Sequence, residues 1–204
     1  MQLWVPSGRG ESDFTEKKSR FIGAARRART AEEARSIVAA LREEHPRSRH
    51  VVWAYVLGAD GVLKGMSDDG EPRGTAGRPV LDHITGAKLT DTLVTVVRYF
   101  GGIKLGTGGL CSAYGQAARQ ALEAMSREPL IERRQLRLGM EYSVYDTMLR
   151  LLERFEGRVV EDSFGENVSL RAEIPAGVLN DFLAAVENAS RGAAAVELIE
   201  QERG

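Results

Sequence analysis

Apolar residues recur at two different spacings along the first 125 residues, and the spacing distinguishes helices from strands. Residues 30–46 place an apolar side chain on one face at every helical repeat, at Ala34, Ile37, Val38 and Leu41. Thr30 and Glu33 have the spacing of a capping box, and Pro46 cannot continue a helix. The pattern therefore predicts a helix that begins after Thr30 and ends by His45.

Continuous or alternating apolar runs predict the strands of this part of the chain. The expected strands are 17–28, 51–57, 62–66 and 93–100, with the second and third joined by the turn at 58–61 as a hairpin. A longer helix is expected at 110–125. Residues 67–79 contain three glycines and two prolines, so they predict a loop, followed by a short helix at 80–84.

The last 70 residues show a regular alternation of strand and helix patterns. The expected order is strand 136–144, helix 145–157, strands 158–164 and 168–174, helix 175–190 and strand 194–200. This β-α-β-β-α-β order is that of the ferredoxin-like split unit. A boundary falls in 126–135, where charge density rises and Pro129 interrupts the preceding helix. The sequence thus predicts an α+β protein of two domains, 1–130 and 136–204.

Charge is distributed unevenly between the two predicted domains. The net charge of the chain is −1. Residues 1–135 nevertheless carry a balance of +5 and residues 136–204 a balance of −6. Such asymmetry indicates a first domain that faces a polyanion. No apolar run reaches the ~20 residues of a membrane span, and residues 1–14 do not resemble a signal peptide, so we expect a cytoplasmic protein without a membrane partner.

The stretch RYFGGIKLGTGGL at 98–110 combines two cations with five glycines in front of the expected helix. Glycines leave backbone N–H groups uncovered, and a helix start adds partial positive charge, so the stretch has the chemistry of a phosphate site. The residues concerned are Arg98, Gly101, Gly102, Lys104, Gly106, Gly108 and Gly109. The spacing matches neither GxxxxGK[ST] nor GxGxxG in a dinucleotide-binding context. A tight turn with close helix packing explains the glycines equally well.

The stretch SDDGEPRGTAGRP at 67–79 concentrates Asp68, Asp69 and Glu71 within four residues, with Arg73 and Arg78 close behind. These carboxylates suit Mg²⁺ beside a phosphate, or general acid and base catalysis. Asp69-Gly70 also has the composition of a simple turn in a partner-binding loop. The spacing is not that of an EF-hand, and the turn is the interpretation we favour.

Basic residues also follow the first expected strand. Lys18 and Arg20 belong to this group, together with Lys17, Arg26, Arg27 and Arg29. These side chains could contact the phosphate backbone of a nucleic acid, or they could simply form a solvated face. The aromatic residues on strands, Trp53, Tyr55, Tyr99 and Phe100, are expected in the core, with base stacking as the alternative. A single cysteine, Cys111, and three scattered histidines predict neither an internal disulfide nor a zinc site.

Taken together, SDDGEPRGTAGRPVLD at 67–82 and VRYFGGIKLGTGGLCSAYGQA at 97–117 resemble the signatures of the Impact family, of the bacterial YigZ type. KSRFIGAA at 18–25 and the acidic second domain match the family's layout too, so the resemblance covers the whole chain. It implies a first domain with the fold of the second domain of ribosomal protein S5. It also implies a second, ferredoxin-like domain similar to the last domain of elongation factor G.

Both relatives of these domains work on the ribosome, so the resemblance implies a link to translation or RNA. We expect a non-catalytic protein that binds RNA or the ribosome and regulates translation, with no cofactor and no metal. One alternative is an enzyme that binds a nucleotide or phosphate at the glycine-rich loop with Mg²⁺. A second alternative is a scaffold for protein partners. The resemblance transfers no catalytic role to any of these residues.

Overall fold

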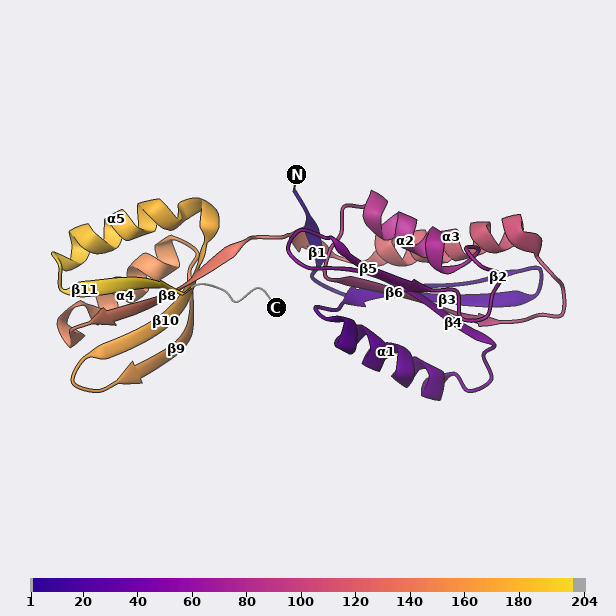
Figure 1. Ribbon diagram of the computed structural model, residues 1–204, viewed down its shortest axis with the longest axis horizontal. Coiled ribbons are helices and arrows are strands. Elements are labelled where there is room, and N and C mark those ends of the chain that lie inside the picture. The colour runs from indigo at the N-terminus through magenta and orange to yellow at the C-terminus, as the bar shows by residue number, and fades with distance from the viewer. Residues whose placement is uncertain (1, 200–204) are drawn as a thin grey trace. The chain divides into compact units, whose positions relative to one another are not determined.

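The computed structural model of the chain describes residues 2–199, and these fall into two units, Met1–Leu130 and Ile131–Gly204 (Figure 1). Both units combine helices with antiparallel sheets. The prediction of an α+β protein with two structural regions is therefore confirmed. None of the helices described within residues 2–199 is long and apolar enough to cross a membrane.

A five-stranded antiparallel sheet forms the centre of the first unit. In spatial order its strands are β2 (Gly10–Glu16), β3 (Ser19–Arg27), β6 (Thr92–Tyr99), β4 (His50–Leu57) and β5 (Leu63–Ser67). The helix α1 (Ala31–Glu44) covers one face of the sheet, and α2 (Gly77–Gly86) and α3 (Gly106–Ala124) cover the other (Figure 1). A separate pair, β1 (Trp4–Pro6) and β7 (Arg127–Pro129), joins the two ends of this unit.

The core of the first unit lies mainly between the sheet and the pair α2 and α3. Phe21, Val52, Val96 and Tyr114 are fully buried there. The other face packs against α1 through two smaller clusters. Because β6 is covered on both faces, seven of its eight residues are buried, which explains its continuous apolar run.

The start of α1 follows the predicted capping pattern with one difference. The Glu33 N–H donates to Thr30 Oγ1 at 3.1 Å, as a capping box requires. The Glu33 carboxylate, however, accepts from the N–H of Arg29 at 2.8 Å. The predicted return bond to Thr30 is thus replaced by one to the residue before it.

Several elements of the first unit are absent from the sequence prediction or are longer than it expects. The strand β2 reads GESDFTE, and it gives no apolar signal because it is a sheet edge with mostly exposed side chains. The helix α3 begins at Gly106, four residues before the predicted start, and α2 begins at Gly77, three residues early. In both cases glycines, which are poor helix formers, occupy the first turn.

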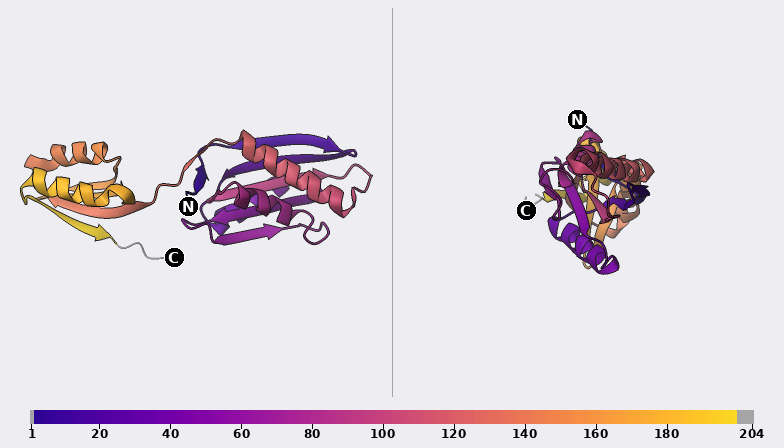
Figure 2. Two further views of the ribbon diagram at one scale, coloured as in Figure 1. Left: turned by 90° about the horizontal axis from the view of Figure 1, so that it is seen from above. Right: turned by 90° about the vertical axis from the view of Figure 1, so that its right-hand side faces the viewer.

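The second unit is a four-stranded antiparallel sheet with two helices against one face (Figure 2). Its elements are β8 (Arg133–Met140), α4 (Tyr142–Arg154), β9 (Arg158–Phe164), β10 (Val168–Pro175), α5 (Leu179–Ser190) and β11 (Ala194–Ile199). A short 3₁₀ turn, η1 (Ala176–Val178), precedes α5. The sheet order is β11-β8-β10-β9, and the β-α-β-β-α-β element order is the predicted one. The strand β8 and the helix α4 each begin three residues before their predicted starts.

Candidate nucleic-acid interface

Four connections meet at one end of the sheet in the first unit. They are the β2–β3 turn at 17–18, the α1–β4 connection at 45–49, the β5–α2 connection at 68–76 and the β6–α3 connection at 100–105. We call these four segments the loop end. The Arg49 N–H donates to the carbonyl of Arg98 at 3.1 Å, and the Gly101 N–H donates to Ser19 Oγ at 3.2 Å. Both glycine-rich signatures of the sequence therefore lie in this one region.

Gly101 fixes how closely two of these connections approach. A Cβ at this position would lie 2.0 Å from the backbone carbonyl of Lys18. Only glycine allows this contact, which brings the basic turn at 17–18 against the glycine-rich loop. Gly102 and Gly106 have φ values of +87° and +74°, so glycine also suits their backbone conformation.

A buried ion pair between Arg98 and Glu71 connects the two signature loops. Arg98 Nη1 donates to Glu71 Oε1 at 2.5 Å, and each side chain is 5% exposed. Tyr114 Oη donates to the same carboxylate oxygen at 2.7 Å, and Arg98 Nη2 donates to Ser19 Oγ at 3.3 Å. The sequence predicts Arg98 as a phosphate ligand and Glu71 as a carboxylate of the acidic loop. In the structure these two side chains instead bind each other inside the fold. Charge pairing of this kind positions the loops.

The hydroxyl of Tyr114 is a hydrogen-bond donor in this network. Burial raises the pKa of its hydroxyl above the ordinary value, and the hydrogen bond to Glu71 and the charge of that carboxylate raise it further. The hydroxyl therefore stays protonated and holds the Glu71 carboxylate in place.

Asp68 caps the first turn of α2. Its carboxylate accepts from the N–H groups of Gly74 at 2.8 Å, Ala76 at 3.0 Å and Gly77 at 2.8 Å. Burial favours the neutral form of this carboxyl, but the three N–H donors and the charge of Arg73 outweigh burial and hold its pKa below the ordinary value. Asp68 thus satisfies backbone donors that the helix start leaves open.

Asp69 is bonded within the protein as well. Its carboxylate accepts from Arg42 Nη2 at 2.5 Å and from the Val51 N–H at 2.6 Å. Burial disfavours its charge, yet these two donors lower its pKa below the ordinary value. Its carbonyl oxygen lies 2.7 Å from His50 Nδ1. Across residues 2–199, no group of three or more His, Cys, Asp and Glu side chains is placed to hold a metal ion.

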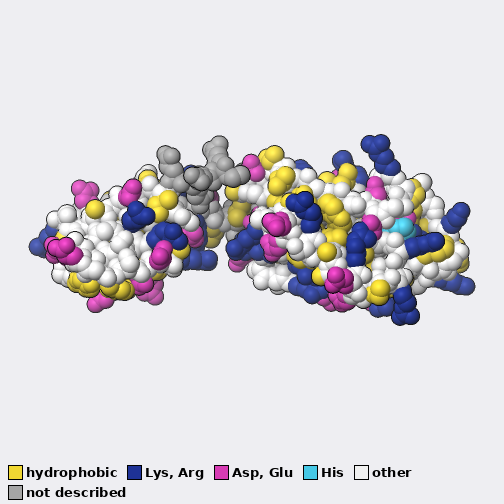
Figure 3. All heavy atoms as spheres, turned by 60° about the horizontal axis from the view of Figure 1, so that its bottom comes forward, with side chains coloured by type: hydrophobic (Ala, Val, Ile, Leu, Met, Phe, Trp, Pro, Cys, Tyr) yellow, Lys and Arg dark blue, Asp and Glu magenta, His cyan; other side chains and the backbone are white. Residues whose placement is uncertain are grey.

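Six cations at the loop end are exposed and form no ion pair with any residue that the structure describes. They are Lys17, Lys18, Arg47, Arg49, Arg73 and Lys104. Figure 3 shows Lys and Arg side chains grouped around this end of the first unit. Two further predicted ligands are already paired: Arg20 binds Asp13 at 2.5 Å and Arg78 binds Asp82 at 2.7 Å. The loop end therefore presents excess positive charge.

Arg47 and Arg49 are not among the phosphate ligands that the sequence predicts. Their signal is the segment HPRSRH, in which Pro46 ends α1 and the arginines fall in the connection to β4. Arg49 lies over the ring of Phe100 at 5.7 Å from its centroid, and this ring is 39% exposed. The pair adds an aromatic surface next to the cations, as proteins that bind single-stranded nucleic acids commonly have. Tyr99, Trp53 and Tyr55 are half-buried.

The first turn of α3 is open to an anion. The side chain of its N-cap residue, Leu105, makes no capping hydrogen bond, and the first turn itself contains no acidic residue. Gly106 and Gly108 are exposed, Gly109 is half-buried, and a Cβ at Gly108 would meet no atom within 4 Å. The fold therefore requires no glycine at position 108, and its absent side chain leaves the N–H groups of the helix start accessible.

Comparison with known proteins places this chain in a family. Residues 17–122 match the model of the Impact N-terminal domain, and residues 138–193 match a domain of unknown function, DUF1949. The first match alone takes in more than half of the chain, and the relatives described next agree with it. The chain belongs to the Impact family, as the two loop signatures indicated.

Two of the relatives are similar to this chain along nearly their whole length. An Impact family member of Haemophilus influenzae is 38% identical over 186 residues, 90% of each chain. The Impact family member YigZ of Escherichia coli is 38% identical over 187 residues, 91% of this chain and 92% of that one. A crystal structure described as that of a hypothetical protein has a TM-score of 0.75 at 36% identity and covers 98% of both chains.

Proposed function

We propose that this chain is a non-catalytic protein that binds RNA, free or within the ribosome, through the loop end of its first unit, and that it regulates translation. The observation that carries the proposal is the set of six exposed cations at the loop end that form no ion pair within residues 2–199. Cations that neutralise backbone phosphates release counterions, and this release is the main source of affinity for nucleic acids.

The arrangement of the loop end suits a flexible strand of phosphates. The turn with Lys17 and Lys18 contacts Gly101, and Lys104 follows three residues later in the same glycine-rich loop. The exposed ring of Phe100 offers a stacking surface beside them. The open first turn of α3 adds backbone N–H donors. A single strand, whose bases and phosphates are both accessible, can use all three features.

Nucleotide chemistry with Mg²⁺ has less support. Hard cations need free carboxylate oxygens. Asp68, Asp69 and Glu71 each accept two or three hydrogen bonds from the protein itself. The link to translation rests on the resemblance of the two domains to domains of ribosomal protein S5 and elongation factor G.

Fluorescence anisotropy with the full chain and a labelled single-stranded RNA of ~20 nucleotides tests the proposal. At about 50 mM salt we expect saturable binding that weakens as salt increases. Co-sedimentation with purified ribosomes tests whether the chain binds RNA within the ribosome. Absence of binding to both RNA and ribosomes at this salt concentration would contradict the proposed function.

A further inference from the structure

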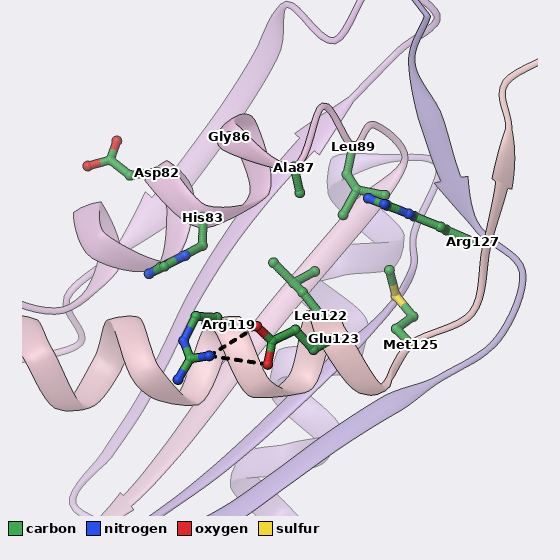
Figure 4. Close-up of a pocket in the computed structure, with 10 residues that line it drawn as sticks. All are labelled: Asp82, His83, Gly86, Ala87, Leu89, Arg119, Leu122, Glu123, Met125 and Arg127. Atoms are coloured by element: carbon green, nitrogen blue, oxygen red, sulfur yellow. Dashed lines mark hydrogen bonds and ion pairs between the residues drawn. The ribbon is translucent and has the colours of Figure 1, made fainter.

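A cavity of about 470 Å³ opens between the second halves of α2 and α3 (Figure 4). Both helices begin at the loop end and run away from it, so the cavity shares no residue with the loop end. Its volume falls within the range of small-molecule sites, roughly 300 to 1,000 Å³. Of the residues that line the cavity, the family signatures at 67–82 and 97–117 include only Asp82.

The floor of the cavity is apolar. Leu89 and Met125 are 2% and 5% exposed, and Leu122 and Ala87 lie beside them. Gly86 contributes no side chain, and a Cβ there would meet no atom within 4 Å. The wall formed by the end of α2 is therefore thin, and an apolar body could contact the floor directly.

The charges around the cavity are unbalanced once the pairs are considered. Asp82 binds Arg78 at 2.7 Å, and Glu123 binds Arg119 at 3.0 Å, each pair within one helix. Arg127, by contrast, has no carboxylate partner within residues 2–199. Its guanidinium lies over the ring of Trp4, 5.2 Å from the centroid.

The close-up shows how these groups are arranged. Arg127 extends from β7 toward Leu89 at one end of the cavity, and His83 and Arg119 lie near each other at the other end (Figure 4). Ala87 and Leu122 lie between the two ends, and Met125 lies beside Arg127 (Figure 4). The cavity thus has an apolar middle and, at one end, a cation held by an aromatic ring.

From this arrangement we infer that the cavity binds a small organic anion with an apolar body. The apolar body covers the floor between α2 and α3, and the anionic group pairs with Arg127. Arg127 is exposed and has no carboxylate partner within residues 2–199, so its charge attracts an anionic ligand more than a neutral one and repels a cation. This site is independent of RNA binding at the loop end, so either proposal stands if the other fails.

Trp4 supplies the readout for a test. The chain has two tryptophans, and Trp53→Phe leaves Trp4 as the one that remains. Octanoate, octylammonium and octanol are titrated into this full-length variant while tryptophan emission is recorded. We expect octanoate to bind at least tenfold more tightly than octylammonium. Over butanoate, hexanoate and octanoate, affinity should rise about three- to fourfold per added methylene.

Three variants, made in the Trp53→Phe chain, separate the cavity from any other apolar surface. Arg127→Gln should weaken octanoate binding about tenfold or more, measured by calorimetry because the variant also changes the surroundings of Trp4. Ala87→Leu fills the cavity without changing a charged residue, so it should weaken the binding of octanoate and of octanol alike. Arg35→Gln, on the opposite face of the sheet, should change neither, and circular dichroism reports whether each variant is folded.

The results decide the proposal in either direction. Selectivity for the anion that depends on Arg127 and is blocked by Ala87→Leu supports it. Equal affinity for octanoate and octylammonium would overturn it, as would unchanged octanoate binding in a folded Arg127→Gln or Ala87→Leu variant. Absence of octanoate binding at about 10 mM would overturn it too.

Discussion

Replacing Lys17, Lys18 and Lys104 by glutamine should halve the salt dependence of RNA binding. For single strands, the slope of log affinity on log salt is about −0.7 per neutralised phosphate. Six contacts from the loop end predict a slope of about −4, and the three that remain predict about −2. From about 50 to 200 mM salt, the parent chain should then lose roughly 300-fold in affinity and the variant roughly 20-fold.

The assay is fluorescence anisotropy with one labelled single-stranded RNA at four salt concentrations. A triple glutamine variant of equal charge change, at Arg35, Lys64 and Lys88, is the matched control. These three residues are exposed and belong to the same unit, but they lie outside the loop end. The control should keep the slope of the parent chain.

Two results would refute the reasoning. If the loop-end variant and the control change the slope equally, the net charge of the unit and not its distribution determines binding. If neither changes the slope, RNA binds elsewhere. Circular dichroism and urea unfolding should show both variants folded with nearly unchanged stability, because exposed substitutions cost little.

Three further predictions concern the loops themselves. Glu71→Gln leaves Arg98 buried without its carboxylate and should cost about 3 to 5 kcal/mol in urea unfolding; a cost below 1 kcal/mol would contradict the ion pair. Asp68→Ala should cost about 1 to 2 kcal/mol near neutral pH. The pKa of the Asp68 carboxyl in the folded protein lies below its ordinary value of 3.8. The loss of stability in the variant should therefore be complete above pH 3.8 and should vanish as the pH falls through the folded pKa. A loss of stability that does not change with pH would argue against the cap. Gly108→Ala should stabilise α3 by about 0.5 to 1 kcal/mol and weaken RNA binding, whereas Gly101→Ala should destabilise the fold. Unchanged RNA affinity in the Gly108→Ala variant would exclude the start of α3 as a contact with RNA.

Periodicity predicted most of the fold, because buried faces impose a spacing on the chain. The helix α1 and the order of the second unit were recognisable for this reason. The strand β2 was not, since an exposed edge strand needs no apolar alternation. The helix starts of α2 and α3 were placed late because their glycines suit a contact or an open helix start more than a helix interior.

The site was only partly predictable for a different reason. Spacing along the chain cannot show that Glu71 and Arg98, 27 residues apart, neutralise each other. Read singly, both looked available to a ligand. The role of Gly101 depends on the approach of Lys18 across the sheet, and Arg49 gains its position from the carbonyl of Arg98. Long-range pairing determines which charges face solvent, and no local pattern encodes it.

Amide chemical shifts of the isotope-labelled full chain, followed while unlabelled single-stranded RNA is added, test the central claim most directly. We predict that the amides of 17–18, 47–49 and 101–109 shift together and saturate at one RNA concentration. Shifts confined to residues 131–199, or no shifts at about 50 mM salt, would contradict RNA binding at the loop end.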